Sequence, residues 1–192
     1  MKKQSTILAL VLALSIGLVS FKAIDGNYAV NASESQLKWT GYHLAKSYEH
    51  WGYVDLKSGN IEVSNGKITS GEFTIDMTSI ANKDVEGEKE SKKLDGHLKS
   101  NDFFAVKKYP EAKLVIKKVD ASGKATGDLT IRGITKEIEF DTKVKEASDE
   151  KIVATADIKV DRTDFKVMYG WKLENAILSN EFRMEVELVA NK

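Results

Sequence analysis

The chain has 192 residues, of which 42% are hydrophobic and 30% charged, a composition typical of one soluble globular domain. Lysine plus arginine and aspartate plus glutamate each total 29, so the net charge is zero and gives no electrostatic footprint for nucleic acid. The absence of cysteine excludes disulfides, thiol catalysis, cysteine-ligated zinc and covalent c-type haem.

The N-terminus has the pattern of an export signal. Lys2 and Lys3 precede an apolar run over residues 7–19, which is too short to span a bilayer comfortably. We therefore expect residues 1–23 to be a secretory signal peptide and residues 24–192 to form one periplasmic or secreted domain, with no integral membrane span after cleavage. An uncleaved membrane anchor is the alternative, because no clean small-x-small cleavage site stands out.

The first half of the mature chain alternates apolar and polar residues with period two, which is typical of strands with one buried face. The alternation changes phase after Tyr53, where Val54 and Leu56 follow, and this predicts a bulge or strong bend. Asn65-Gly66 lies between two apolar runs and predicts a hairpin, because both turn positions require positive φ.

Residues 84–116 form a different kind of segment. Charged residues are dense from 84 to 100, with Leu94 and Leu98 four apart, which predicts a solvated helix with a buried apolar stripe. Pro110 is the only proline and biases Tyr109 toward an extended backbone, so a strand is expected to start near Ala112. This insert is expected to cap or cover the sheet.

Regular alternation resumes after the insert and runs to the C-terminus, interrupted by a long irregular connection over residues 161–180. About eight strands with one apolar and one charged face indicate an antiparallel sheet. Both a two-sheet sandwich and a closed barrel fit this pattern, and the phase change favours closure. The predicted fold is all-β with a small helical insert, an eight-stranded antiparallel β-barrel.

A barrel of this size is either filled by its own side chains or holds one small ligand. Small residues on the inward faces (Gly41, Ala125, Gly127, Ala154 and Ala156) leave room in the lumen, but they fit a tapered solid core equally well. If the core is hollow, the candidate lumen residues are Trp39, Tyr53, Phe73, Ile75, Phe103, Phe104, Leu129, Ile131, Ile138, Phe140, Ala154, Ala156, Phe182 and Met184.

Five segments occur in order along the chain: TIDMTSI (74–80), KLDGHLKSNDFF (93–104), KKYPEAKL (107–114), GDLTIRGITKEIEF (127–140) and DRTDF (161–165). Together they resemble the YceI-like family of polyisoprenoid- or lipid-binding proteins. The resemblance implies a lipocalin-like barrel with a helical segment near one end, exported, holding a long apolar chain in its lumen. The chain departs from the family at Lys166, where glycine is frequent, and at Trp171 in a loop that tends to be small.

Chemistry other than binding has little support in the sequence. His43, Glu49 and His50 could approach one another across adjacent strands and hold zinc, but their spacing matches no ligand pattern, and no metal or other cofactor is expected. No G-x-S-x-G nucleophile elbow or glycine-rich phosphate loop occurs.

The sequence favours a binding protein that holds an amphiphilic long-chain lipid, with an isoprenoid or quinone-type tail, non-covalently in the lumen. Two alternatives remain open: a periplasmic enzyme that uses the histidine-bearing strands, and a ligand-free interaction module of a stress response. A homodimer is compatible with the sequence.

Overall fold

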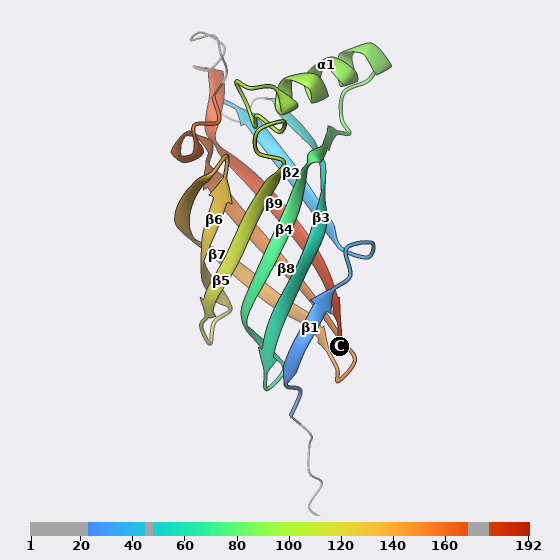
Figure 1. Cartoon of the computed structure of the whole chain (residues 1–192), viewed down its shortest axis with the longest axis vertical. Coiled ribbons are helices and arrows are strands. Elements are labelled where there is room, and N and C mark those ends of the chain that lie inside the picture. The colour runs from blue at the N-terminus through green and yellow to red at the C-terminus, as the bar shows by residue number, and fades with distance from the viewer. Residues whose placement is uncertain (1–22, 45–47, 169–176) are drawn as a thin grey trace, which may run out of the picture.

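The computed structural model describes residues 23–44, 48–168 and 177–192, in which long antiparallel strands wind around a common axis and one helix lies across the upper end (Figure 1). The elements are β1 (Gly26–Val30), β2 (Gln36–His43), β3 (Glu49–Ser64), β4 (Lys67–Asn82), α1 (Glu88–Lys99), β5 (Glu111–Val119), β6 (Lys124–Ile131), β7 (Ile134–Ala147), β8 (Lys151–Asp161), the short 3₁₀ helix η2 (Arg162–Phe165) and β9 (Leu178–Asn191).

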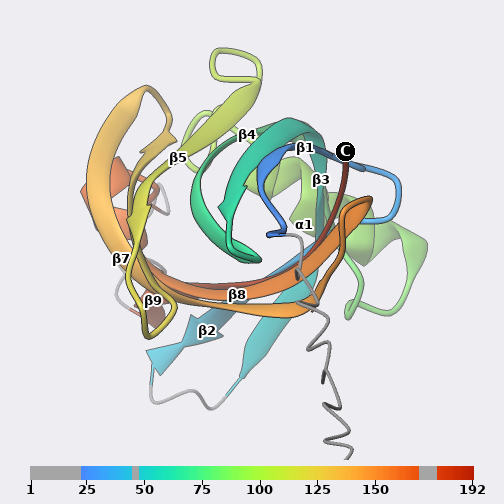
Figure 2. The same ribbon diagram turned by 90° about the horizontal axis from the view of Figure 1, so that it is seen from below.

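The nine strands of the described residues occupy eight positions around a closed barrel. β1 and β2 both pair with β3 on one side and with β9 on the other, so together they occupy one strand position of the barrel, interrupted between them. The pairing of β3 with β4 closes the sheet, and the ring is visible along the axis in Figure 2. The predicted eight-stranded antiparallel barrel is confirmed. β3 and β4 have 16 residues each, which gives them a length of about 50 Å.

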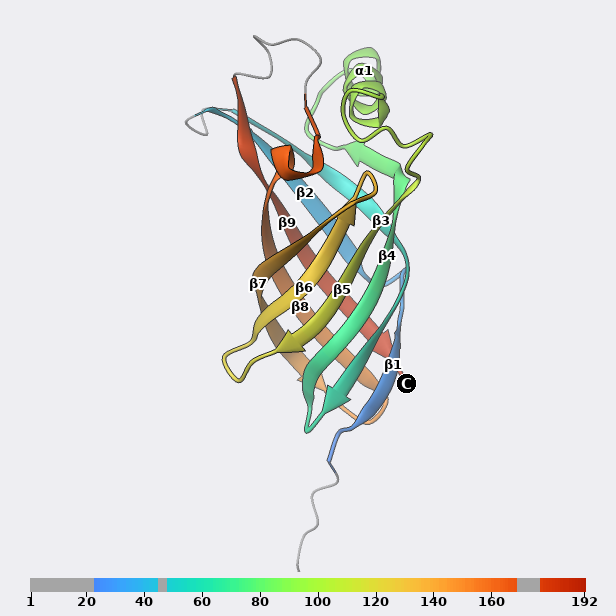
Figure 3. The same ribbon diagram turned by 60° about the vertical axis from the view of Figure 1, so that its left-hand side comes forward.

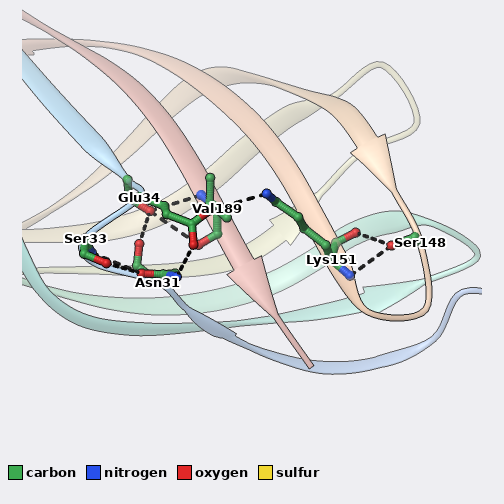
Figure 4. A network of polar contacts seen from close by, with 7 residues as sticks. Asn31, Ser33, Glu34, Ser148, Lys151 and Val189 are labelled. Carbon is green, nitrogen blue, oxygen red and sulfur yellow. Dashed lines mark hydrogen bonds and ion pairs between the residues drawn. The ribbon is translucent and has the colours of Figure 1, made fainter.

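A polar turn joins β1 to β2 (Figure 4). The Asn31 amide donates to the Val189 carbonyl of β9 at 2.8 Å, and the Asn31 side chain donates to Glu34 at 2.6 Å. Lys151 of β8 reaches Glu34 at 3.4 Å. The turn therefore stays attached to the neighbouring strands although the ladder is broken there.

The predicted hairpin at Asn65-Gly66 joins β3 and β4 at the lower end. Asn65 has φ 51° and Gly66 φ 71°, the positive values that a two-residue primed turn requires. The helix in the insert is also confirmed, and β5 begins at Glu111, one residue before the expected start.

The lower end of the barrel is solid. Tyr28, Ile61, Ala125, Ile152 and Ala190 are completely buried there, and the Tyr28 hydroxyl donates to the Ser148 carbonyl at 3.0 Å. Tyr28, Ile61, Ile152 and Ala190 come from β1, β3, β8 and β9, and Ala125 comes from β6. Their close packing closes the lumen below.

The upper end is covered on one side by α1 (Figure 3). Asn82, buried at the end of β4, donates from its side chain to Asp95 of α1 at 2.7 Å and to the Ser91 carbonyl at 3.0 Å. These bonds fix the helix so that Leu98 is buried and Leu94 packs against the core. In the described part of the chain, no helix is long and apolar enough to cross a membrane.

Candidate ligand-binding cavity

A cavity of about 360 Å³ lies inside the barrel between the solid lower end and α1. Its wall receives side chains from every strand except β1, and from α1 and the segment that follows it. Inward positions of the strands carry aliphatic and aromatic residues, so the wall is almost entirely apolar. An apolar cavity of roughly 150 Å³ stays dry and accepts benzene, so this one has room for a substantially larger apolar group.

The structure places twelve of the fourteen candidate lumen residues on the cavity wall. They are Trp39, Phe73, Ile75, Phe103, Phe104, Leu129, Ile131, Phe140, Ala154, Ala156, Phe182 and Met184. Phe103 and Phe104 come from the insert and meet edge to face with ring centroids 5.1 Å apart. The strand residues and the insert residues therefore face one common space.

Tyr53 lies on the outer wall instead of in the lumen. The pleat of β3 turns Gly52 and Val54 inward, so Tyr53 points out and packs against Trp51 with centroids 5.9 Å apart. The change of phase comes later in the strand, since Leu56 and Ile61 both face inward and the pairing with β4 shifts register between Leu56 and Ser58. β3 also shifts register against β4 between Tyr53 and Asp55, where the sequence predicted a bulge, but the inward phase is kept from Gly52 to Leu56.

Ile138 also lies off the cavity wall, although it packs against the core as a half-buried residue of β7. The small inward residues also fall into two groups, those on the cavity wall and those away from it. Gly41, Ala154 and Ala156 line the cavity, whereas Ala125 is buried in the solid lower end. A Cβ on Gly127 would lie 2.5 Å from the Val115 carbonyl oxygen, so this glycine permits close approach of two strands and does not widen the lumen.

The charged and histidine side chains on the cavity wall gather at the upper end, here called the mouth, whereas Thr142 and Thr155 line the wall lower down. The most buried of them is Arg162 of η2, with 4% of its surface exposed. Its guanidinium donates to the carbonyls of Ser179 and Val167 at 2.9 Å each, and to that of Leu178 at 3.4 Å. Desolvation by burial lowers the pKa of Arg162, opposed by the nearby charge of Asp161. Arginine keeps its proton in proteins, so the mouth contains a buried cation that ties the start of β9 to η2.

His43 and His50 also line the mouth, on β2 and β3, and His43 pairs with Leu178 of β9. Their ring centroids are 6.5 Å apart, and Tyr48 packs edge to face on His50 at 4.8 Å. His50 Nδ1 lies 2.7 Å from Asp84 Oδ2, and Asp84 also accepts from the Trp51 amide at 3.0 Å. Within the described residues, no three histidine, aspartate or glutamate side chains come together as a metal site. The trio of His43, Glu49 and His50, which the sequence analysis considered but did not favour, is not assembled in the described residues.

Comparisons with known proteins agree with this geometry. The YceI-like domain model matches residues 28–190. The chain belongs to the YceI-like family. A UPF0312 protein of Pseudomonas putida strain W619 is 32% identical over 146 residues, which cover 73% of this chain and 71% of that protein.

Two solved structures share the YceI-like barrel. BcnA of Burkholderia cenocepacia superposes with a TM-score of 0.66 at 22% identity, covering 84% of this chain and 99% of BcnA. A polyisoprenoid binding domain from Saccharophagus degradans gives a TM-score of 0.62 at 13% identity, covering 88% and 99%. At these identities the likeness concerns the fold.

The structure shows why glycine suits position 166, where this chain departs from the YceI-like pattern with lysine. Lys166 ends η2 with φ 57° and ψ 30°, the left-handed conformation that glycine adopts without strain. The second departure, Trp171, lies outside the described residues.

Sequence reasoning missed Arg162, His43 and His50 as wall residues, together with the apolar underside of α1 around Leu94 and Leu98. Arg162 stands inside the DRTDF segment, and an arginine flanked by two acids does not signal burial. The two histidines follow the inward alternation of Trp39 and Gly41 in β2, and of Gly52 and Val54 in β3, so strand phase could have placed them.

Proposed function

We propose that this YceI-like protein binds an amphiphilic long-chain lipid, with an isoprenoid or quinone-type tail, non-covalently in the barrel cavity. The observation that carries the proposal is the apolar cavity of about 360 Å³, closed at one end and with its charged and histidine side chains at the other. Such a shape suits a ligand with an apolar chain and a polar head. The Saccharophagus degradans neighbour is named a polyisoprenoid binding domain, which supports the same ligand class.

Binding of this kind requires no reactive group, because burial of the apolar chain supplies the free energy. Burial of a methylene is worth about 0.8 kcal/mol, so each five-carbon isoprene unit contributes roughly 4 kcal/mol before the entropy of ordering the chain is subtracted. The cavity wall supplies Trp39, Phe73, Phe140 and Phe182 as large apolar contacts. Because affinity arises from burial alone, no catalytic step belongs to the proposal.

The test is to extract the purified protein with organic solvent and to identify co-purifying lipids by mass spectrometry, alongside native mass spectrometry of the intact complex. We expect a stoichiometric apolar-chain amphiphile that is lost on extraction. A delipidated protein that takes up neither a polyprenol nor a prenylquinone would overturn the proposal and favour a ligand-free module.

We also propose that the protein is exported, with the mature chain starting between about Ser20 and Asn27. The Ile24 carbonyl accepts from the Gly66 amide at 2.9 Å, and Asp25 accepts from the Asn65 amide at 2.6 Å. Cleavage before Ile24 would leave both contacts of the lower hairpin intact. Intact mass of protein expressed with its own N-terminus tests this, and retention of Met1 in a membrane fraction would contradict it.

A further inference from the structure

Large apolar side chains are exposed around the mouth of the cavity. Within the described residues, five large hydrophobic side chains are exposed: Leu44, Tyr48, Val115, Met168 and Ile177. Four of these five flank the two upper connections, with Leu44 and Tyr48 between β2 and β3, and Met168 and Ile177 between η2 and β9. Their exposed fractions lie between 44% and 55%. We call these four residues the apolar rim.

The apolar rim continues directly into the cavity. Ile177 is 49% exposed and also lines the cavity wall, next to Leu178. Leu178 pairs with His43 of β2, and Tyr48 packs against His43 and His50, which both line the wall. A chain that leaves the cavity at this end therefore meets exposed apolar side chains at Ile177 and Tyr48.

We propose that the apolar rim docks on a lipid bilayer and that the ligand enters and leaves the cavity through this contact. The inference rests on the proposed function, because a ligand with a long apolar chain resides in a bilayer when it is not bound. The lower end is filled by Tyr28, Ile152 and Ala190, so in the described structure the mouth is the end through which a chain can pass. Exposed apolar residues on two separate hairpins can enter an interface together, as the tips of a peripheral protein do.

Aromatic residues stand at the level expected for the headgroup region. Trp51 and Tyr53 form an edge-to-face pair on the outer wall of β3, with Lys38 over the Trp51 ring at 5.1 Å. Trp51 is three residues from Tyr48, which is about 10 Å along a strand. Tryptophan and tyrosine favour membrane interfaces because their rings are apolar with one polar atom. A bilayer that receives the rim would meet this pair at its surface.

Basic residues flank the rim near Met168. Lys107, Lys108 and Lys166 are exposed on this side, and the Met168 amide contacts the Asp102 carbonyl at 3.4 Å. The guanidinium of Arg132 contacts the carbonyls of Asn101 and Lys166, which joins the two segments into one surface. With Arg132, the four basic residues outnumber the acids Asp102, Asp161 and Asp164 here, so this surface suits anionic phosphate headgroups.

The experiment uses flotation with vesicles of phosphatidylcholine alone and of phosphatidylcholine with phosphatidylglycerol. We expect the wild type to float with vesicles, more strongly when phosphatidylglycerol is present, and to transfer a dansyl-labelled farnesyl probe to them. The double variant Leu44→Gln, Met168→Gln should float and transfer on the order of tenfold less, since membrane binding scales with buried apolar area. Neither position lines the cavity, so equilibrium uptake of the probe from solution should stay within about twofold.

Val115→Gln is the matched control, because Val115 is 39% exposed on β5, away from the mouth. It should behave as wild type in both assays. Wild-type protein that binds the probe but does not float, or a double variant that floats and transfers like wild type, would overturn the docking surface and leave the proposed function standing. Flotation that depends on Leu44 and Met168 without uptake of the probe would instead overturn the proposed function.

Discussion

Arg162 donates a hydrogen bond from its guanidinium to the Val167 carbonyl at 2.9 Å, inside the turn that ends at the mouth of the cavity. The same side chain reaches the Ser179 carbonyl at the start of β9. A single buried cation thus holds together two segments that the chain connects only through residues 169–176. The stability of the upper end depends on these bonds.

Replacement of Arg162 by methionine removes the donors and leaves buried carbonyls unsatisfied. We expect Arg162→Met to lower the free energy of unfolding by about 3 kcal/mol. Urea denaturation followed by circular dichroism measures this. Lys159→Met, at an exposed position of β8, serves as the control and should change stability by less than about 0.5 kcal/mol. Equal effects of the two substitutions would contradict a structural role for the buried guanidinium.

Substitutions of the small wall residues of β8 test whether the lumen has room for a ligand. In a filled core, Ala154→Phe or Ala156→Phe would overpack and destabilise by roughly 1–3 kcal/mol. In the observed cavity the new ring occupies empty space, so the delipidated variants should unfold at the wild-type temperature or above. Uptake of a polyisoprenoid should fall at least about tenfold, because each displaced isoprene unit removes several kcal/mol of burial.

Val153→Phe provides the matched control for these variants, since Val153 alternates with Ala154 on the opposite face of β8 and is not part of the wall. It should bind lipid like the wild type. Earlier unfolding of both alanine variants, together with no lipid uptake by the wild type, would show that the barrel is solid in solution.

Two tryptophans on opposite faces of the sheet report where a quinone binds. Trp39 lines the cavity and donates from its indole to the Ala81 carbonyl at 3.3 Å, whereas Trp51 lies on the outer wall. In a Trp171→Phe background, a prenylquinone should quench the fluorescence of the Trp51→Phe variant strongly. The Trp39→Phe variant should lose most of this quenching. The opposite pattern would place the ligand outside the barrel.

Substitution of Tyr28 at the lower end should lower the stability of the barrel strongly without changing ligand binding. Tyr28 is completely buried and does not contact the cavity. Tyr28→Ala should lower the free energy of unfolding by about 3–5 kcal/mol through lost burial and a residual void. Tyr28→Phe removes only the hydroxyl that donates to Ser148, and should cost about 1 kcal/mol. Urea unfolding of the two variants measures both effects, and similar losses would contradict the packing role of the ring.

A surface ion pair predicts a pH dependence of stability. Arg183 donates to both oxygens of Asp157, at 2.8 and 2.7 Å, and this hydrogen bonding lowers the pKa of Asp157 below its ordinary value. A depressed carboxyl pKa stabilises the folded state above the unfolded pKa of about 3.9, and the stabilisation is lost as pH falls through the lower folded value. Because both side chains are about a third or more exposed, we expect only about 0.5–1 kcal/mol.

The variant Asp157→Asn isolates this contribution. It should be less stable than the wild type at pH 7, and the difference should shrink toward zero below about pH 3. Thermal unfolding between pH 2 and 7 gives the two curves. A difference that stays constant across this range would mean that packing, and not the charge of Asp157, accounts for the effect.

The local pattern of the sequence determined much of this fold. Period-two alternation placed Trp39, Phe140 and Phe182 on inward faces, because side chains of a strand alternate between two sides. Asn65-Gly66 determined its hairpin, since few other pairs adopt positive φ at both positions. Leu94 and Leu98 determined the buried stripe of α1 through helical spacing. These features depend on neighbours within a few residues, so the sequence alone carries them.

Tertiary structure decided what no local pattern contains. Which of Tyr53 and Val54 faces inward depended on where the pairing of β3 with β4 shifts register, and that shift is set by a partner strand. The contact of His50 with Asp84 spans 34 residues, and the pairing of His43 with Leu178 joins the two halves of the apolar rim. Above all, alternation gives the inward residues of a barrel but not its internal volume. That volume follows from closure of the sheet and from how the side chains meet across it, and both exist only in the folded chain.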